Sequence, residues 1–186
     1  KYSTISNGSY ISGDNLFEVV SGKSERFKNS QKNKIIIAED ALFVTATLDT
    51  NKNIPQGGVY FATLIRRDVP INFLIGVLNS RLLSFIYQAL YGGMHMGGGY
   101  LRYRTAFLEK LPMKIGTEKQ EKQIVDFVDK ILKLNKELQK ITENSDKWNS
   151  IKSEIEKTDK KIDQEVYKLY GLTDKEIKVI EDSTKK

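Results

Sequence analysis

The spacing of apolar residues in this 186-residue chain changes near Gly116. After Gly116, apolar residues recur every three to four positions over two long segments, which is the pattern of amphipathic helices. Before it, short runs of β-branched and aromatic residues alternate with turn-forming residues, which is the pattern of strands. Strands gathered in one part and helices in the other predict an α+β fold. We expect one unit over residues 1–115 and a second over 116–186.

The second unit is predicted to be a long antiparallel helical pair followed by a short C-terminal helix. Thr117 and Gln120 have the spacing of a capping box, and so do Thr173 and Glu176. Gly171 is a glycine stop for the second long helix. Long amphipathic helices joined by a short turn fold back on each other. The side chains expected between them are Ile131, Leu138, Ile151, Ile155 and Ile162.

The first unit is predicted to be a small, twisted, mixed β-sheet with one core helix. The runs "LFEVV", "KIIIAED", "LFVTATL", "VYFATLI" and "YLRYR" have strand composition. Apolar residues at helical spacing between Ile71 and Ala89 predict the helix, which should end at Gly92-Gly93. Because polar residues and Arg81 interrupt this stretch, we expect a core helix and no membrane span.

A glycine-rich stretch, "GGMHMGGGYLRYR", covers residues 92–104 and contains the only histidine of the chain. Glycine lets the backbone approach a ligand closely. Alternation in "YLRYR" places Tyr100, Arg102 and Arg104 on one side of a strand, and Leu101 and Tyr103 on the other. Two interpretations stay open: a loop that lies against DNA, or a flexible connection with surface arginines.

Charge is distributed unevenly between the two parts. Up to Ile115 there are 14 Lys and Arg against 8 Asp and Glu, and from Gly116 onward 16 against 16. The net charge of +6 therefore lies in the first part, as do all the arginines. Because guanidinium groups bind phosphates and guanine edges, an anionic partner is plausible there. An ordinary basic surface is the alternative.

The motifs expected of an enzyme are missing from the sequence. The three prolines are isolated, so there is no Asn/Asp-Pro-Pro-aromatic motif of the kind that amino-methylating DNA enzymes use. No glycine-rich nucleotide-binding fingerprint follows a strand. One histidine and no cysteine exclude a two-histidine metal site and thiolate zinc or iron–sulfur sites. Glu39-Asp40 could bind magnesium, but a solvated strand end is the better interpretation without a surrounding nuclease pattern. We expect this chain to have no catalytic residue, metal or cofactor.

Several segments resemble the target-recognition domains of DNA restriction–modification proteins. They are "LIGVLNSRLLSFIYQ", the glycine loop, "YLRYRTAFLEKLPMK", "EKQEKQIVDFVDKIL" and the tail "IDQEVYKLYGLTDKEIKVIE". The start "NGSYISGDNLFEV" is also similar to the turn and first strand of such domains. The tail resembles most specifically the TaqI-like C-terminal specificity domain of adenine methyltransferases and type IIG restriction enzymes. Specificity subunits of type I systems are related.

This resemblance implies a domain that reads DNA and leaves catalysis to other domains. The implied partners are double-stranded DNA and a methyltransferase domain of the same polypeptide, which binds S-adenosylmethionine and methylates adenine N6. Mg²⁺ would serve a nuclease domain, if the parent has one. The helical pair is then expected to pack on the sheet unit or on that methyltransferase domain. The chain starts "KYSTISNGSY", without an initiator methionine or leader, so we interpret it as part of a longer protein. We expect that protein to be cytoplasmic.

The candidate DNA contacts combine positive charge with the glycine loop and its strand. They are Lys34, Arg67, His95, Tyr100, Arg102 and Arg104. A second hypothesis is an assembly module, whose helical pair docks on a methylase or on a second specificity domain. A residual nuclease is a third, which the missing motifs disfavour. The recognised DNA sequence and the oligomeric state do not follow from the residues.

Overall fold

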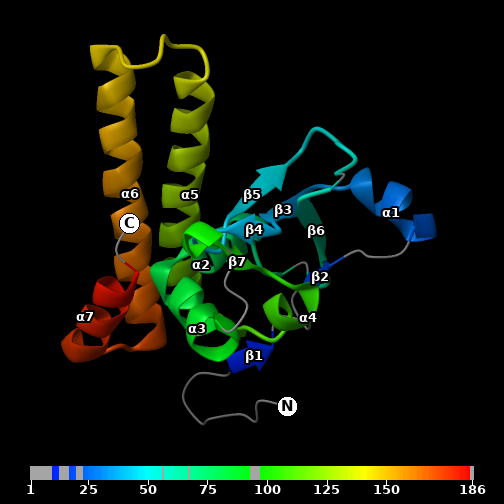
Figure 1. Cartoon of the computed structure of the whole chain (residues 1–186), viewed down its shortest axis with the longest axis horizontal. Coiled ribbons are helices and arrows are strands. Elements are labelled where there is room, and N and C mark those ends of the chain that lie inside the picture. Colours follow the sequence, from blue (N-terminus) through cyan, green and yellow to red (C-terminus); the bar gives the residue numbers. More distant parts are fainter. Residues whose placement is uncertain are drawn as a thin grey trace.

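The computed structural model describes residues 10–12, 17–19, 23–55, 57–66, 68–92 and 97–184. Strands and short helices form one side of the molecule, and two long helices stand beside them (Figure 1). The helices are α1 (Lys23–Ser30), α2 (Ile71–Asn79), α3 (Arg81–Tyr91), the 3₁₀ turn η3 (Gly97–Gly99), α4 (Thr105–Leu108), α5 (Glu118–Leu138), α6 (Asp146–Tyr170) and α7 (Asp174–Ser183). The strands are β1 (Tyr10–Ser12), β2 (Phe17–Val19), β3 (Lys34–Ala38), β4 (Asp40–Ala41), β5 (Ala46–Asp49), β6 (Val59–Leu64), β7 (Leu101–Arg102) and β8 (Pro112–Lys114).

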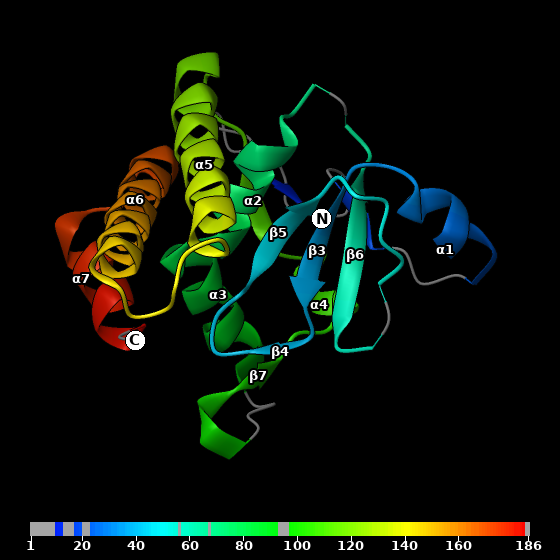
Figure 2. The same cartoon turned by 90° about the horizontal axis from the view of Figure 1, so that it is seen from above.

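Four strands form the main sheet in the order β2-β6-β3-β5. Figure 2 shows three of them, β6, β3 and β5, side by side. Ile35 and Ile37 on the central strand β3 are fully buried, while Ile36 between them is only partly so, which is the alternation expected of a strand. Two further pairs, β1-β8 and β4-β7, complete the strands described. The α+β class is confirmed. The pairings in the described parts are all antiparallel, where a mixed sheet was expected.

The single core helix predicted between Ile71 and Ala89 is in fact two helices, α2 and α3, bent by 59°. Ser80 at the bend has an extended backbone (φ −65°, ψ 151°) and ends one helix while beginning the next. Its hydroxyl donates to the Val77 carbonyl at 2.7 Å and accepts the Leu83 N–H at 3.3 Å. A serine that bonds to both helix ends offers the backbone an alternative to helical continuation. The second helix ends as predicted, with Gly92 at its C-cap.

The described residues contain no single helix that is long and apolar enough to cross a membrane. Only α2 and α3 taken together reach the required length and composition, and they are bent. The side chains of α2 from Phe73 to Leu78 are buried in the protein core, as the core-helix prediction required.

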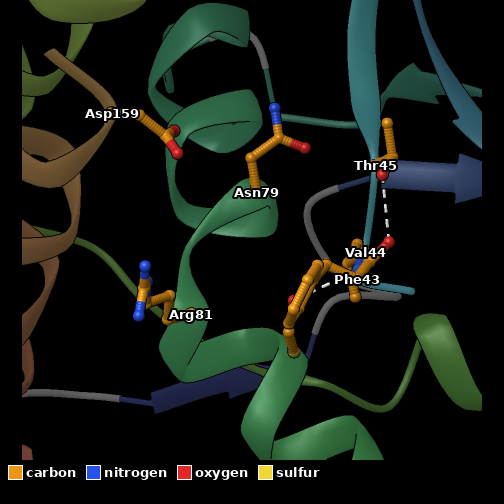
Figure 3. A pocket seen from close by; sticks show the side chains of 7 residues that line it. Phe43, Val44, Thr45, Asn79, Arg81 and Asp159 are labelled. Atoms are coloured by element: carbon orange, nitrogen blue, oxygen red, sulfur yellow. Dashed lines mark hydrogen bonds between the residues drawn. The ribbon is translucent and has the colours of Figure 1, made fainter. Parts of the chain in front are cut away.

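Residues at the bend also bind to the main sheet and to the long helix α6. Asn79 accepts the backbone N–H of Ala46 on β5 at 2.6 Å and donates to the carbonyl of the same residue at 2.8 Å. Arg81, the next residue but one, binds Asp163 of α6 through its backbone N–H (2.8 Å) and its Nε (3.3 Å). In Figure 3, Asn79 lies beside the strand and Arg81 points toward the long helix. The Leu-Asn-Ser-Arg stretch therefore ties the sheet, the bent helices and the hairpin together.

The antiparallel pair of long helices, α5 and α6, is confirmed (Figure 1). Thr117 and Gln120 form the predicted capping box, and Thr173 and Glu176 form another at the start of α7. Gly171 ends α6 in the left-handed conformation, with φ 71°. Of the interface residues predicted, Ile151 and Ile162 are buried, whereas Ile131, Leu138 and Ile155 are partly buried.

One apolar cluster is shared by the two predicted units. It contains Ile35 and Leu74 from the first unit together with Ile124, Val128 and Ile162 from the hairpin. Gly76 of α2 permits the closest approach, since a Cβ there would lie 2.5 Å from Cγ2 of Ile124. The hairpin therefore packs on α2 in this structure. Its division from the first unit as a separate domain stays a prediction.

Candidate nucleic-acid interface

The segment Tyr100–Arg104 has two sides of opposite character, as its alternation predicted. Leu101 and Tyr103 are completely buried. Tyr100 is 45% exposed, the Arg102 side chain is 40% exposed, and Arg104 is exposed. The structure therefore brings three of the six candidate contacts together on one solvent-facing edge.

A buried tyrosine of α3 holds this segment in place. The Tyr87 hydroxyl donates to the carbonyl of Arg102 and accepts the backbone N–H of Arg104, both at 3.0 Å. The Tyr87 ring also packs against the Tyr103 ring, with centroids 4.5 Å apart. From the other side, the Tyr103 N–H donates to the Glu39 carbonyl at 2.7 Å. The backbone between the two arginines is thus fixed by hydrogen bonds on both sides.

The glycines before the segment adopt a conformation that other residues rarely reach. Gly98 and Gly99 have φ values of 78° and 81°, and together with Gly97 they make the short turn η3. This left-handed backbone explains the need for glycine just before Tyr100. His95, one of the predicted contacts, lies outside the described residues.

Arg102 forms a bidentate ion pair with Asp40, its partner across the β4-β7 ladder. Its Nε lies 2.9 Å from Oδ1 of Asp40, and its Nη2 lies 3.1 Å from Oδ2. The hydrogen bond from Arg102 lowers the pKa of the Asp40 carboxyl, so this carboxylate stays ionised at neutral pH. Sequence analysis had assigned Asp40 only to a solvated strand end. The side chain is indeed exposed, but it holds the arginine.

Two more polar residues surround the pair. Burial, followed by the charge of Glu39, raises the pKa of Tyr60, while the charges of Arg104 and Arg102 lower it. Glu39 also contributes to the raised pKa of Arg102. These effects place Glu39, Tyr60 and both arginines within electrostatic reach of one another. The exposed edge therefore mixes two cations with two carboxylates.

Lys34 does not belong to this surface, and its prediction as a DNA contact is corrected. Its side chain is completely buried, with Nζ 2.6 Å from Oδ2 of Asp49 and 2.8 Å from the Ser30 carbonyl. Burial raises the pKa of Asp49, but hydrogen bonds from Lys34 and the loop outweigh it, and the pKa is lowered overall. A lysine paired inside the protein cannot reach a phosphate. Arg67, the remaining candidate, lies outside the described residues.

The residues that sequence reasoning missed are Tyr87 and Asp40, which position the arginines. Tyr87 gave no signal, because an aromatic residue at core spacing is ordinary. Asp40 gave a weak signal, as an acidic residue at a strand end. Only the strand pairing of β4 with β7, which joins residues 62 positions apart, reveals its role.

A hollow of about 200 Å³ lies between the β4–β5 loop, the bend of α2 and α3, and α6 (Figure 3). Its polar groups already have structural partners. Ser84 accepts the Val44 N–H at 3.1 Å, Asn79 binds Ala46, and Arg81 binds Asp163. No group of three or more metal-ligating side chains occurs in the part of the chain that the structure describes. The edge at Tyr100–Arg104 is therefore the better candidate for a binding site.

Comparison with known proteins bears on the family of this chain. A search of curated proteins returned no match. A solved structure titled as the type IIL restriction-modification enzyme MmeI in complex with DNA has a similar fold, with a TM-score of 0.53 at 20% sequence identity. The match covers 83% of this chain and 22% of that one. The family model of the TaqI-like C-terminal specificity domain matches residues 1–113. The chain belongs to this family of specificity domains.

Proposed function

We propose that this chain recognises a DNA sequence for a restriction–modification protein. The observation that carries the proposal is the exposed edge formed by Tyr100, Arg102 and Arg104, held rigidly by Tyr87 in a domain of the specificity family. Side chains on a fixed backbone can be presented to DNA at reproducible positions. The similar fold in an enzyme solved with DNA supports the same function.

We further propose that catalysis is carried out by other domains of the same polypeptide. The chain spans about a fifth of the MmeI enzyme with the similar fold, so a longer protein is expected. An adjacent methyltransferase domain would bind S-adenosylmethionine and methylate adenine N6. A nuclease domain, if present, would use Mg²⁺. The charged and aromatic edge described above would supply only the choice of site.

A second function, contact with a protein partner, is favoured by an apolar groove between α3 and α7. The groove has a volume of about 320 Å³, and Val179 at its border is 54% exposed. Its apolar lining comprises Leu82, Phe85, Ile86, Leu172, Val179 and Ile180. An apolar hollow favours protein over DNA as its partner. This role would be compatible with DNA recognition on the other edge.

Titration of a labelled duplex with this chain tests the proposal. We expect weak binding at about 50 mM salt that falls steeply by about 200 mM, because phosphate contacts release counterions. Arg104→Ala should weaken binding and reduce the salt dependence by about one phosphate contact. Lys136→Ala removes the same charge from an exposed position on α5 and should have little effect. Absence of binding at low salt, or equal loss with Lys136→Ala, would contradict the proposal.

A further inference from the structure

The geometry of the Arg102–Asp40 pair leaves one edge of the guanidinium available. Arginine has five N–H donors. The Nε–H and one N–H of Nη2 are directed to Asp40, at 2.9 and 3.1 Å. The remaining donors belong to Nη1 and Nη2, at the end of the side chain. They form a second fork that can donate two parallel hydrogen bonds to one more acceptor group.

The charges around Arg102 disfavour a phosphate as that acceptor. Arg102 pairs with Asp40 and lies within electrostatic reach of a second carboxylate, Glu39. Its positive charge is therefore largely neutralised, and its long-range attraction for the DNA backbone is weak. A base edge differs from a phosphate, since it is neutral and is recognised by hydrogen-bond geometry. Guanine presents two acceptors, N7 and O6, spaced for such a fork.

The position of the fork is fixed better than that of an ordinary surface arginine. The carbonyl of Arg102 accepts the Tyr87 hydroxyl, and Leu101 and Tyr103 on either side are completely buried. The carboxylate of Asp40 then fixes the side chain in the plane of the ion pair. A side chain that is ordered before binding loses little entropy on contact with a base.

We propose that Arg102 reads the N7 and O6 edge of one guanine in the major groove, and that Asp40 is its positioning residue. This inference rests on the proposed function, because it names the base contact within the DNA recognition site. Arg104 pairs with no carboxylate among the described residues, so it has the role of a phosphate contact. Of the two arginines of "YLRYR", Arg102 thus contacts a base and Arg104 contacts the DNA backbone.

Selection from a randomised duplex library tests the inference, using the full-length protein that contains this domain and sequencing of the bound DNA. Wild type should enrich guanine at one position of the selected DNA. Arg102→Ala and Asp40→Asn should each lower this enrichment by about tenfold or more. Arg102→Lys keeps the charge but lacks the fork, so it should not restore the preference. Arg104→Ala is the matched control and should weaken all sequences alike.

A chemical probe keeps the test independent of folding. In wild type, 7-deazaguanine at the enriched position removes the N7 acceptor and should lower affinity by about tenfold. In Arg102→Ala the same probe should change nothing further. An unchanged preference in Arg102→Ala, or uniform weakening of all sequences, would overturn the guanine contact and leave the proposed function standing. A preference kept by Asp40→Asn would overturn the positioning role. If wild type enriches no position, both the inference and the proposed function fail.

Discussion

The β4-β7 ladder and the α5-α6 hairpin achieve their rigidity by opposite means. Each strand of the ladder has two residues, whereas the helices have 21 and 25. The ladder is too short to bury a continuous apolar face, and it is held by the Tyr87 hydroxyl and by the Arg102–Asp40 pair. The hairpin is held by an apolar stripe that joins the main core.

This difference separates the part of the chain that we propose for DNA recognition from the part that gives stability. The ladder is held through its backbone, so it does not depend on the outward side chains of Tyr100, Arg102 and Arg104. The exception is the ion pair of Arg102 with Asp40. The apolar side chains of the hairpin pack against the core, and the net charge of the chain from Gly116 onward is zero. Replacements in the ladder should therefore change recognition, and replacements in the hairpin should change stability.

The largest effect is expected where the hairpin meets α2. Gly76→Val should lower the free energy of unfolding by about 3 kcal/mol, because even a Cβ would lie 2.5 Å from Cγ2 of Ile124 and 3.0 Å from Cγ2 of Val128. Both neighbours are β-branched residues within a helix, which are stiff at χ1. Chemical denaturation monitored by circular dichroism measures the change.

Ala89→Val on the exposed face of α3 is the control for this variant, since it adds the same side chain to a helix without a clash. Its cost should stay within about 0.7 kcal/mol. In the double variant Gly76→Val with Ile124→Ala, the neighbour that the valine would meet is truncated. The changes in unfolding free energy of the two single variants should therefore not add. Equal stability of Gly76→Val and Ala89→Val would show that the hairpin does not pack closely on α2.

A smaller effect on stability and a larger effect on recognition are expected in the ladder. Tyr87→Phe removes a hydroxyl that binds the backbone of both Arg102 and Arg104 and should cost about 1–2 kcal/mol. Tyr103→Phe is its matched control. The Tyr103 hydroxyl is buried and has no hydrogen-bond partner among the described residues, so its loss should be neutral or slightly stabilising.

The same two variants should differ in DNA binding. Tyr87→Phe should weaken sequence selection, because the segment that presents the arginines loses both hydrogen bonds of the Tyr87 hydroxyl, whereas Tyr103→Phe should keep it. Melting curves and library selection on the two proteins provide the measurements. If Tyr103→Phe proves as damaging as Tyr87→Phe, ring packing and not the hydroxyl holds the ladder.

Local patterns predicted much of the fold. The capping boxes at Thr117 and Thr173, the stop at Gly171 and the alternation of Tyr100–Arg104 are all properties of a few adjacent residues. The family resemblance, carried by motifs over nearly the whole chain, was also confirmed for residues 1–113. The capping boxes, the glycine stop and the alternation each involve residues only a few positions apart, so spacing alone could reveal them.

What sequence reasoning missed depends on distant partners. The apolar stripe from Ile71 to Ala89 continues past Ser80, so it did not reveal the bend that Ala46 and Asp163 stabilise from other elements. In the sequence, Lys34 cannot be told from a basic surface residue, because its ion pair with Asp49 is seen only in the structure. The helix α1 has no apolar stripe and was not predicted.

The proposed function requires that DNA contacts the β4-β7 ladder and not the α5-α6 hairpin. Hydrogen–deuterium exchange on the full-length protein, free and bound to its selected duplex, distinguishes the two. We predict that DNA slows exchange in peptides covering Tyr100–Arg104 and leaves peptides covering Ile131–Ile155 unchanged. Protection of the hairpin peptides with no change at Tyr100–Arg104 would show that DNA binds the hairpin instead of the ladder.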